Sequence, residues 1–157
     1  MSENNLKKKR ARSSEDKKKK YLRILEEGEK LFIKYGPEGT KMRTLAENVN
    51  ISLANLYNYI SSKRELWFAI RKKKLLEYID AREKALKPYK SSLVDLTEKW
   101  GEFFLDYAAE DYERYRMIWS VTPPSGDQVG PIEKDFLQTK LLDRTINHFR
   151  EAFKAEN

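Results

Sequence analysis

The chain has 157 residues, of which 39% are hydrophobic and 36% charged, with a formal net charge of +7. The absence of cysteine excludes disulfides, thiolate metal sites and thiol nucleophiles. No apolar run approaches the roughly 18–20 residues of a membrane span. No hydrophobic stretch follows the basic N-terminus as it would in a signal peptide, so we expect a cytoplasmic protein with no membrane partner.

The positive charge is concentrated in the first half of the chain. Residues 1–75 hold 20 Lys and Arg against 9 Asp and Glu, whereas residues 76–157 hold 12 against 16. This asymmetry predicts a polyanion-binding part followed by a part with another role. Residues 1–16 are expected to form a disordered basic arm, because they are rich in charge and almost free of apolar side chains. Two roles stay open for this arm: contact with DNA, as in homeodomain arms, or solubilisation alone.

Helical periodicity begins at Tyr21 and predicts a first helix over about 17–35, which ends at the breaker sequence Gly36-Pro37. We find no convincing strand, repeat or heptad array. The sequence therefore predicts an all-α fold, with a three-helix N-terminal domain followed by a helical C-terminal domain. The later helices are expected over about residues 41–49, 53–60, 62–85, 92–109, 112–121 and 131–153.

Several of these helices begin at residues that favour capping. Thr40 precedes the second helix and Ser52 the third, and each has a hydroxyl oxygen that can accept from a free backbone N–H. Ser62 and Glu65 form a capping box at the start of the long fourth helix. Ser92 is placed to cap the fifth helix, and residues 122–127 read as a loop.

Residues 42–60 contain the strongest functional signal. Two short helices that meet at a steep angle need a small residue where they approach, which Ala46 supplies. They also need a left-handed residue in the turn, and Asn50 is the best choice there after glycine. A small apolar set would fix the angle between the helices: Leu45, Val49, Ile51 and Leu56.

With these positions assigned to packing, the second short helix has a free outer face of a size that fits the major groove, about 12 Å wide. The competing interpretation is a pair of ordinary short helices in an all-α core. The combined spacing and the basic surroundings favour DNA. The outer face and helix ends carry Leu53, Ala54, Asn55, Tyr57, Asn58 and Tyr59.

Residues 20–70 resemble the N-terminal domain of the tetracycline-repressor (TetR) family. Members of this family are mostly dimeric transcriptional repressors with a ligand-binding helical C-terminal domain. The resemblance rests on Leu31-Phe32, Gly36, Gly39-Thr40, Leu45-Ala46, Ile51-Ser52, Leu56-Tyr57, Ser62-Lys63 and Leu66.

The resemblance implies a set of DNA contacts. Thr40 and Tyr57 would contact phosphates, Lys63 would contact the backbone from the start of the long helix, and Arg43 would lie near the DNA. Leu53, Asn55, Asn58 and Tyr59 correspond to base-reading positions. The whole predicted set is Thr40, Lys41, Arg43, Ser52, Leu53, Asn55, Tyr57, Asn58, Tyr59 and Lys63.

The sequence departs from the family pattern at three informative positions. Asn50 replaces the usual turn glycine. Gly28 stands where the family prefers alanine, at a cost of roughly 1 kcal/mol in helix propensity. Leu53 stands where a polar residue is frequent, so one DNA contact is expected to be apolar, as to a thymine methyl.

Large aromatic side chains are concentrated in the second half of the chain. They could line a pocket for a small apolar effector, or they could form an ordinary core, which is more common for aromatics at helical spacing. The family resemblance favours a pocket. The candidate residues are Trp100, Phe103, Phe104, Tyr107, Tyr115, Met117, Trp119 and Phe136.

These features predict a helix-turn-helix domain over residues 17–65 and a helical regulatory and dimerisation domain over 66–157. The leading hypothesis is a ligand-responsive repressor that binds a pseudo-palindromic operator in double-stranded DNA as a homodimer. The alternatives are a helical interaction protein and a non-specific nucleic-acid-binding protein with a basic arm. We expect no enzymatic activity, cofactor or metal, because no nucleophile, phosphate-loop or metal-ligand motif is present and His148 is the only histidine.

Overall fold

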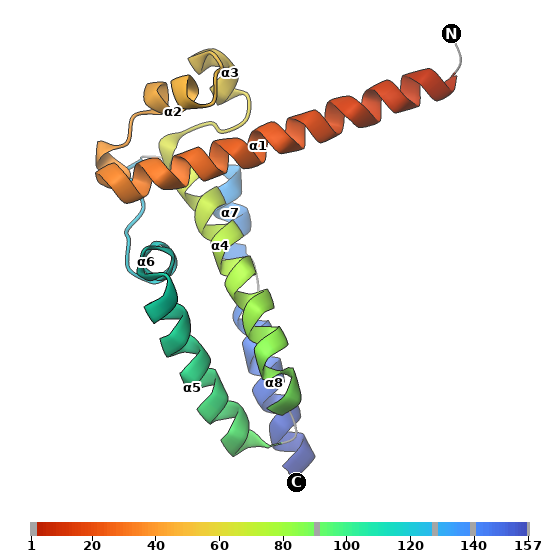
Figure 1. Cartoon of the computed structure of the whole chain (residues 1–157), viewed down its shortest axis with the longest axis vertical. Helices are drawn as coiled ribbons and strands as arrows, with labels where there is room; N and C mark the ends of the chain where they lie inside the picture. The colour runs from red at the N-terminus through yellow and green to blue at the C-terminus, as the bar shows by residue number, and fades with distance from the viewer. Residues whose placement is uncertain (1–2, 90–91, 127–128, 139–140, 157) are drawn as a thin grey trace. The chain divides into compact units, whose positions relative to one another are not determined.

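The computed structural model describes residues 3–89, 92–126, 129–138 and 141–156, and within these ranges it contains helices and no strand. The all-α prediction is therefore confirmed. None of the helices in these ranges is both long and apolar enough to cross a membrane. In chain order (Figure 1), the elements are α1 (Glu3–Gly39), α2 (Met42–Asn48), α3 (Leu53–Tyr57), α4 (Lys63–Leu86), the 3-10 turn η1 (Lys87–Tyr89), α5 (Leu93–Glu110), α6 (Tyr112–Trp119), α7 (Pro131–Gln138) and α8 (Leu141–Glu156).

The chain folds into two compact units. The first consists of Met1–Ile70 and Pro123–Gly130, and the second of Arg71–Thr122 and Pro131–Asn157. The first compact unit thus extends into α4 and includes a segment between α6 and α7. The functional domain bounds of 17–65 and 66–157 stay a prediction.

Helix α1 begins at Glu3, whereas we expected a disordered arm up to residue 16 and a helix from residue 17. The residues that precede Tyr21 are largely Lys, Arg, Glu and Ala, which have good helix propensity and can extend a helix once it is nucleated. An ion pair one turn apart, between Lys19 Nζ and Glu15 Oε1 at 3.0 Å, supports this extension.

Gly36 interrupts α1 with a kink shortly before the end of the helix at Gly39. Its backbone angles, φ 71° and ψ 167°, lie in a region that is essentially restricted to glycine. The amide and the hydroxyl of Thr40 both donate to the Gly36 carbonyl, at 3.1 and 2.8 Å. The expectation that Thr40 caps α2 is therefore wrong. Lys41 is the N-cap residue, and it makes no side-chain cap because its ammonium can only donate and cannot accept from a helix N–H.

Replacing Gly36 with alanine is expected to destabilise the first unit by about 1–3 kcal/mol, which is the cost of a side chain in this backbone region. An added Cβ meets nothing within 4 Å, so the loss would measure backbone strain alone. Gly101 in α5 also has open space around an added Cβ, and its φ is not positive. Gly101→Ala should therefore stabilise the chain by roughly 0.5–1 kcal/mol. Urea unfolding followed by circular dichroism gives both values, and equal behaviour of the two variants would contradict the strain argument.

Three predicted caps are confirmed. In each, a serine Oγ accepts from the backbone N–H three residues later, which satisfies one of the free donors at the helix start. The pairs are Ser52 with Asn55 (3.1 Å), Ser62 with Glu65 (3.0 Å) and Ser92 with Asp95 (3.2 Å).

One predicted helix boundary is wrong: the recognition-helix candidate α3 ends at Tyr57, although we expected it to continue to residue 60. Within the range expected for the last helix, 131–153, the structure describes α7 and α8, and residues 139–140 lie outside the described ranges.

The core of the first unit draws on α1, α2, α3 and the beginning of α4. Gly28 lies where α1 approaches α4, because a Cβ at this position would stand 3.0 Å from Leu66 Cδ2 and 3.2 Å from Ile70 Cδ1. This close packing gives a structural reason for glycine at this position inside a helix. The other buried residues of the unit include Ile24, Leu25, Leu31, Phe32, Leu45, Leu56, Ile60 and Trp67.

The second unit has two adjoining apolar clusters. One joins α4, α5, α6 and α7 through Tyr78, Tyr107 and Ile118, with Phe136 packed against them. The other joins α4, α5 and α8 through Leu86, Leu96 and Ala152.

The basic run at residues 71–74 lies at the start of the second unit. The Arg71 guanidinium lies over the Phe136 ring at 5.3 Å, and burial lowers the Arg71 pKa. Lys72 pairs with Asp135, and Lys73 donates to Glu77 at 2.6 Å. These contacts favour a structural role for the run over binding of an external phosphate.

Candidate nucleic-acid interface

The turn between α2 and α3 is formed by Asn50. Its φ is 55°, the left-handed value that the sequence predicted for it. The Ile51 amide donates to the Ala46 carbonyl at 3.0 Å and the Asn50 amide to the Glu47 carbonyl at 3.1 Å. This pair of bonds is a Schellman motif, which ends α2 and directs the chain into α3.

Burial separates the two faces of this helix pair as expected. Leu45, Ala46, Val49 and Leu56 are each at most 3% exposed, and Ile51 is partly buried. Because these side chains fix α3 against the rest of the unit, the polar residues between them are presented outward. The local packing and turn of a helix-turn-helix are therefore present.

The predicted DNA-binding residues differ in accessibility. Thr40 is buried, and its hydroxyl is used within the chain. Leu53, Asn55, Tyr59 and Lys63 are partly exposed. The remaining members are exposed: Lys41, Arg43, Ser52, Tyr57 and Asn58.

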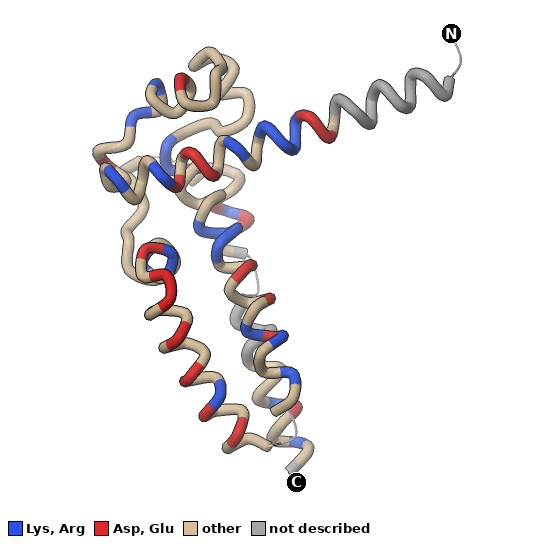
Figure 2. Tube along the Cα trace, in the orientation of Figure 1, with Lys and Arg blue, Asp and Glu red and all other residues tan. Residues whose placement is uncertain are grey.

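The charged residues differ between the helices. Figure 2 shows both basic and acidic residues along the described part of α1 and basic residues at the beginning of α4, whereas α5 carries mainly acidic residues. No group of His, Cys, Asp and Glu that could hold a metal ion occurs among the described residues.

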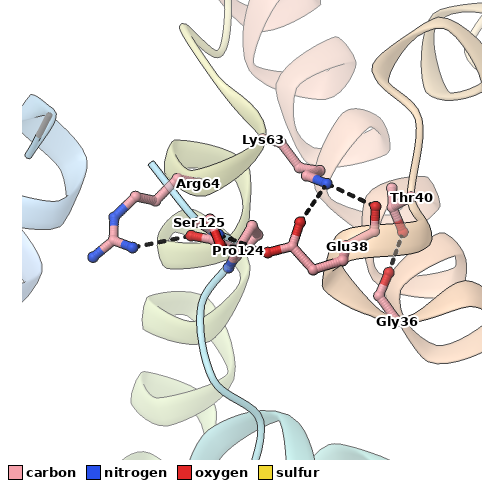
Figure 3. A network of polar contacts seen from close by, with 7 residues as sticks. All are labelled: Gly36, Glu38, Thr40, Lys63, Arg64, Pro124 and Ser125. Atoms are coloured by element: carbon pink, nitrogen blue, oxygen red, sulfur yellow. Dashed lines mark hydrogen bonds and ion pairs between the residues drawn. The ribbon is translucent and has the colours of Figure 1, made fainter. Parts of the chain in front are cut away.

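Lys63 takes part in a polar network that the sequence did not predict (Figure 3). Its ammonium donates to the Glu38 carbonyl oxygen at 2.9 Å and lies 3.4 Å from Glu38 Oε2. The other carboxylate oxygen of Glu38 accepts from the Ser125 amide at 2.7 Å and from its hydroxyl at 3.0 Å. The Ser125 donors, followed by Lys63, hold the pKa of Glu38 below its usual value. The ammonium expected to contact the DNA backbone thus has a partner inside the first unit.

The segment 123–130 is attached to the start of α4 at two further points. Arg64 Nη1 donates to the Pro124 carbonyl at 3.0 Å. A Cβ on Gly130 would collide with the carboxylate of the buried Glu65, so the chain passes directly over this carboxylate. The sequence reads these residues only as a loop, because their partners lie 60 or more positions away.

The candidate pocket residues of the second unit lie close together. Tyr107 contacts Phe103 with a ring-centroid distance of 6.0 Å, and Phe104 contacts Tyr115 at 5.6 Å and Trp119 at 6.2 Å. Trp100 stacks on Phe104 at 6.0 Å. Met117 is buried in α6, and Phe136 packs against the cluster around Tyr107. The structure thus gathers most of these aromatic residues, while their use as a ligand pocket stays a prediction.

The helix-turn-helix and its basic surroundings are typical of one class of DNA-binding domain, and comparison with known proteins finds similar proteins of that class. A sequence model described as "Bacterial regulatory proteins, tetR family" matches residues 24–70. No curated protein sequence matches the chain.

Solved structures show the same relationship. The TetR family transcriptional regulator PfmR from Thermus thermophilus is 26% identical, with a TM-score of 0.56 over 84% of this chain and 69% of that chain. A TetR family transcription regulator from Marinobacter aquaeolei is 18% identical and shares the fold, with a TM-score of 0.54 over 92% of this chain and 68% of that chain. The resemblance to the TetR family is confirmed in this form: residues 24–70 match the model of that family, and the chain is similar to a solved TetR family transcriptional regulator.

Proposed function

We propose that this regulator is a ligand-responsive repressor that binds a pseudo-palindromic operator as a homodimer, with α3 in the major groove. The proposal rests mainly on α3, in which Leu56 is fully buried while Asn55, Tyr57 and Asn58 are left outward with polar side chains. An asparagine amide on such a face can form a bidentate contact with an adenine. The repressor role is supported by the family resemblance.

The homodimer is supported by exposed apolar side chains in the second unit. On α8, Ile146 and Phe153 are 49% and 58% exposed and are spaced seven residues apart, which places them on one side of the helix. On α7, Leu137 is 66% exposed. Such side chains are typical of an interface with a second copy of the chain. Sedimentation at twice the chain mass of 18.7 kDa is expected, and a monomer at micromolar concentration would contradict the proposal.

Ligand responsiveness is supported by the aromatic cluster around Phe104. The buried indole N–H of Trp100 has no acceptor among the described residues. An unpaired donor in an aromatic environment suits a small, mostly apolar ligand with one acceptor group, because a buried unpaired donor costs about 1–3 kcal/mol.

The network of Lys63, Glu38 and Ser125 supplies a route for coupling. The segment that contains Ser125 joins α6 to α7, two helices of the unit that holds the aromatic cluster. A ligand that shifts this segment would change how firmly Glu38 retains Lys63, and thereby how free Lys63 is to bind a phosphate. Coupling energies between such sites are typically about 1–3 kcal/mol.

Selection of binding sites from random duplex DNA tests the proposed function. We expect a two-fold symmetric consensus with half-site centres about 34–36 Å apart or a multiple of this spacing. The selected duplex should be bound far more tightly than a scrambled duplex at the same salt concentration. Recovery of no consensus, together with affinity that only falls with salt, would instead indicate non-specific binding or a role as an interaction protein.

A further inference from the structure

A cavity of about 620 Å³ lies within the first unit beside the recognition-helix candidate. One side is formed by Lys17, Lys18 and Tyr21 of α1. The other side is formed by residues of α3 and the turn after it: Asn55, Asn58 and Tyr59. Three residues of α1 that the sequence did not connect with binding are thus brought together with three candidate base readers.

Only two of the four lysines in this part of α1 border the cavity. Residues 17–20 are four consecutive lysines, and successive side chains on a helix are rotated by about 100°. Lys17, Lys18 and Tyr21 border the cavity. Lys19 is paired with Glu15, and Lys20 is not part of the lining.

The lining has the chemistry of a phosphate site. It contains two ammonium groups, two amides and two phenols, and no carboxylate. Neither Lys17 nor Lys18 forms an ion pair with another side chain that the structure describes. Burial, followed by the Glu65 carboxylate, raises the pKa of Tyr21, so its phenol stays protonated and keeps its donor at neutral pH.

We propose that this cavity receives the phosphate backbone of the DNA strand that borders the groove read by α3. This inference rests on the proposed function, because it assumes that α3 lies in a major groove. The groove is flanked by phosphates on both sides, so a helix that enters it places the residues beside its end next to a backbone strand. Lys17 and Lys18 then contact successive phosphates and Tyr21 donates to one of them. These contacts fix the register in which Asn55 and Asn58 meet the bases.

The test compares two full-length variants that remove the same charge from the same run. In Lys17→Gln/Lys18→Gln the cavity loses both ammonium groups, and in Lys19→Gln/Lys20→Gln the cavity is unchanged. Glutamine keeps the helix propensity close to that of lysine. Affinities of the wild type and both variants are measured by fluorescence anisotropy over a series of salt concentrations, on the selected duplex and on a scrambled duplex.

Because each phosphate contact contributes roughly −0.9 to the slope of log affinity against log salt, the Lys17/Lys18 variant should lose close to two units of slope. The Lys19/Lys20 variant should keep nearly the wild-type slope. Equal slopes in the two variants, whether both reduced or both unchanged, would overturn the inference, because only general charge would then be acting. If the wild type binds the selected and the scrambled duplex equally well, the proposed sequence-specific binding is wrong. The salt slopes of the two variants, compared on either duplex, would still decide whether the cavity binds phosphates.

Discussion

Asn55→Ala is expected to weaken binding to the selected duplex by roughly 5- to 150-fold, because a bidentate contact from an asparagine amide to a base contributes about 1–3 kcal/mol. The Asn55 side chain lies on the outer face of α3, and only its backbone N–H takes part in the Ser52 cap. Alanine therefore keeps the cap and favours the helix. The variant should also lose its preference at one base pair of the consensus, and fluorescence anisotropy with single-base-pair variants of the duplex measures this directly.

Asn48→Ala is the matched control. Asn48 is exposed at the end of α2, and its backbone carbonyl, not its side chain, accepts from Arg23 at 3.4 Å. It should bind the selected duplex as the wild type does. If both variants bind equally well, the assignment of the reading face to α3 is wrong.

Tyr57→Phe separates phosphate contacts from base contacts. Tyr57 is 45% exposed, and loss of its hydroxyl removes one hydrogen bond worth about 0.5–1.5 kcal/mol, or roughly a two- to twelvefold loss of affinity. Since a phosphate contact carries no sequence information, selected and scrambled duplexes should be affected equally. A loss confined to the selected duplex would make Tyr57 a base reader instead.

The largest effect on stability is expected at Trp67. Its side chain is fully buried in α4 and meets the Phe68 ring edge-on, at a centroid distance of 5.0 Å. Trp67→Ala removes this buried volume and leaves a cavity, at an expected cost of about 3–5 kcal/mol. Domains of this size are stabilised by only about 5–15 kcal/mol, so the first unit should lose roughly a fifth or more of its stability.

Trp119→Ala provides the comparison. Trp119 is 46% exposed, although its ring lies 5.7 Å from Tyr78 and 6.2 Å from Phe104. A cost near 1 kcal/mol is expected, since little closed cavity can form at a half-exposed site. Urea unfolding of both variants tests the difference, and a Trp67 variant that unfolds at the wild-type midpoint would contradict the burial of this side chain.

Features that depend on neighbouring residues could be predicted from the sequence. Asn50 was expected to adopt a left-handed conformation and Ser52, Ser62 and Ser92 to cap helices, because each needs only residues within one turn. Thr40 failed for the opposite reason. The predicted cap required its hydroxyl oxygen to accept from a helix N–H, but the kink at Gly36 brings a carbonyl within 2.8 Å, to which the hydroxyl donates.

Features that depend on distant residues could not be predicted. Glu38 contacts Ser125 across 87 positions. The turn-forming residues around Ser125 predict a loop but do not indicate which residue the loop contacts. Likewise, the sequence showed that Gly28 lowers helix propensity, but it did not show that Gly28 packs closely against Leu66. The cavity beside α3 was missed because Lys17 and Lys18 read as part of a uniform basic run.

The attachment of Pro123–Gly130 to the first unit bears on how the specificity of this regulator can be exchanged with that of another. A chimaera joined at residue 70 alone would combine the helix-turn-helix of one parent with the 123–130 segment of the other. Glu38 and Arg64 of one parent would then have to contact the 123–130 segment of the other parent, whose residues evolved beside different side chains. The residue above Glu65, at position 130, would also not have to be glycine. A chimaera with a correctly folded first unit therefore has to take both Met1–Ile70 and Pro123–Gly130 from the same parent.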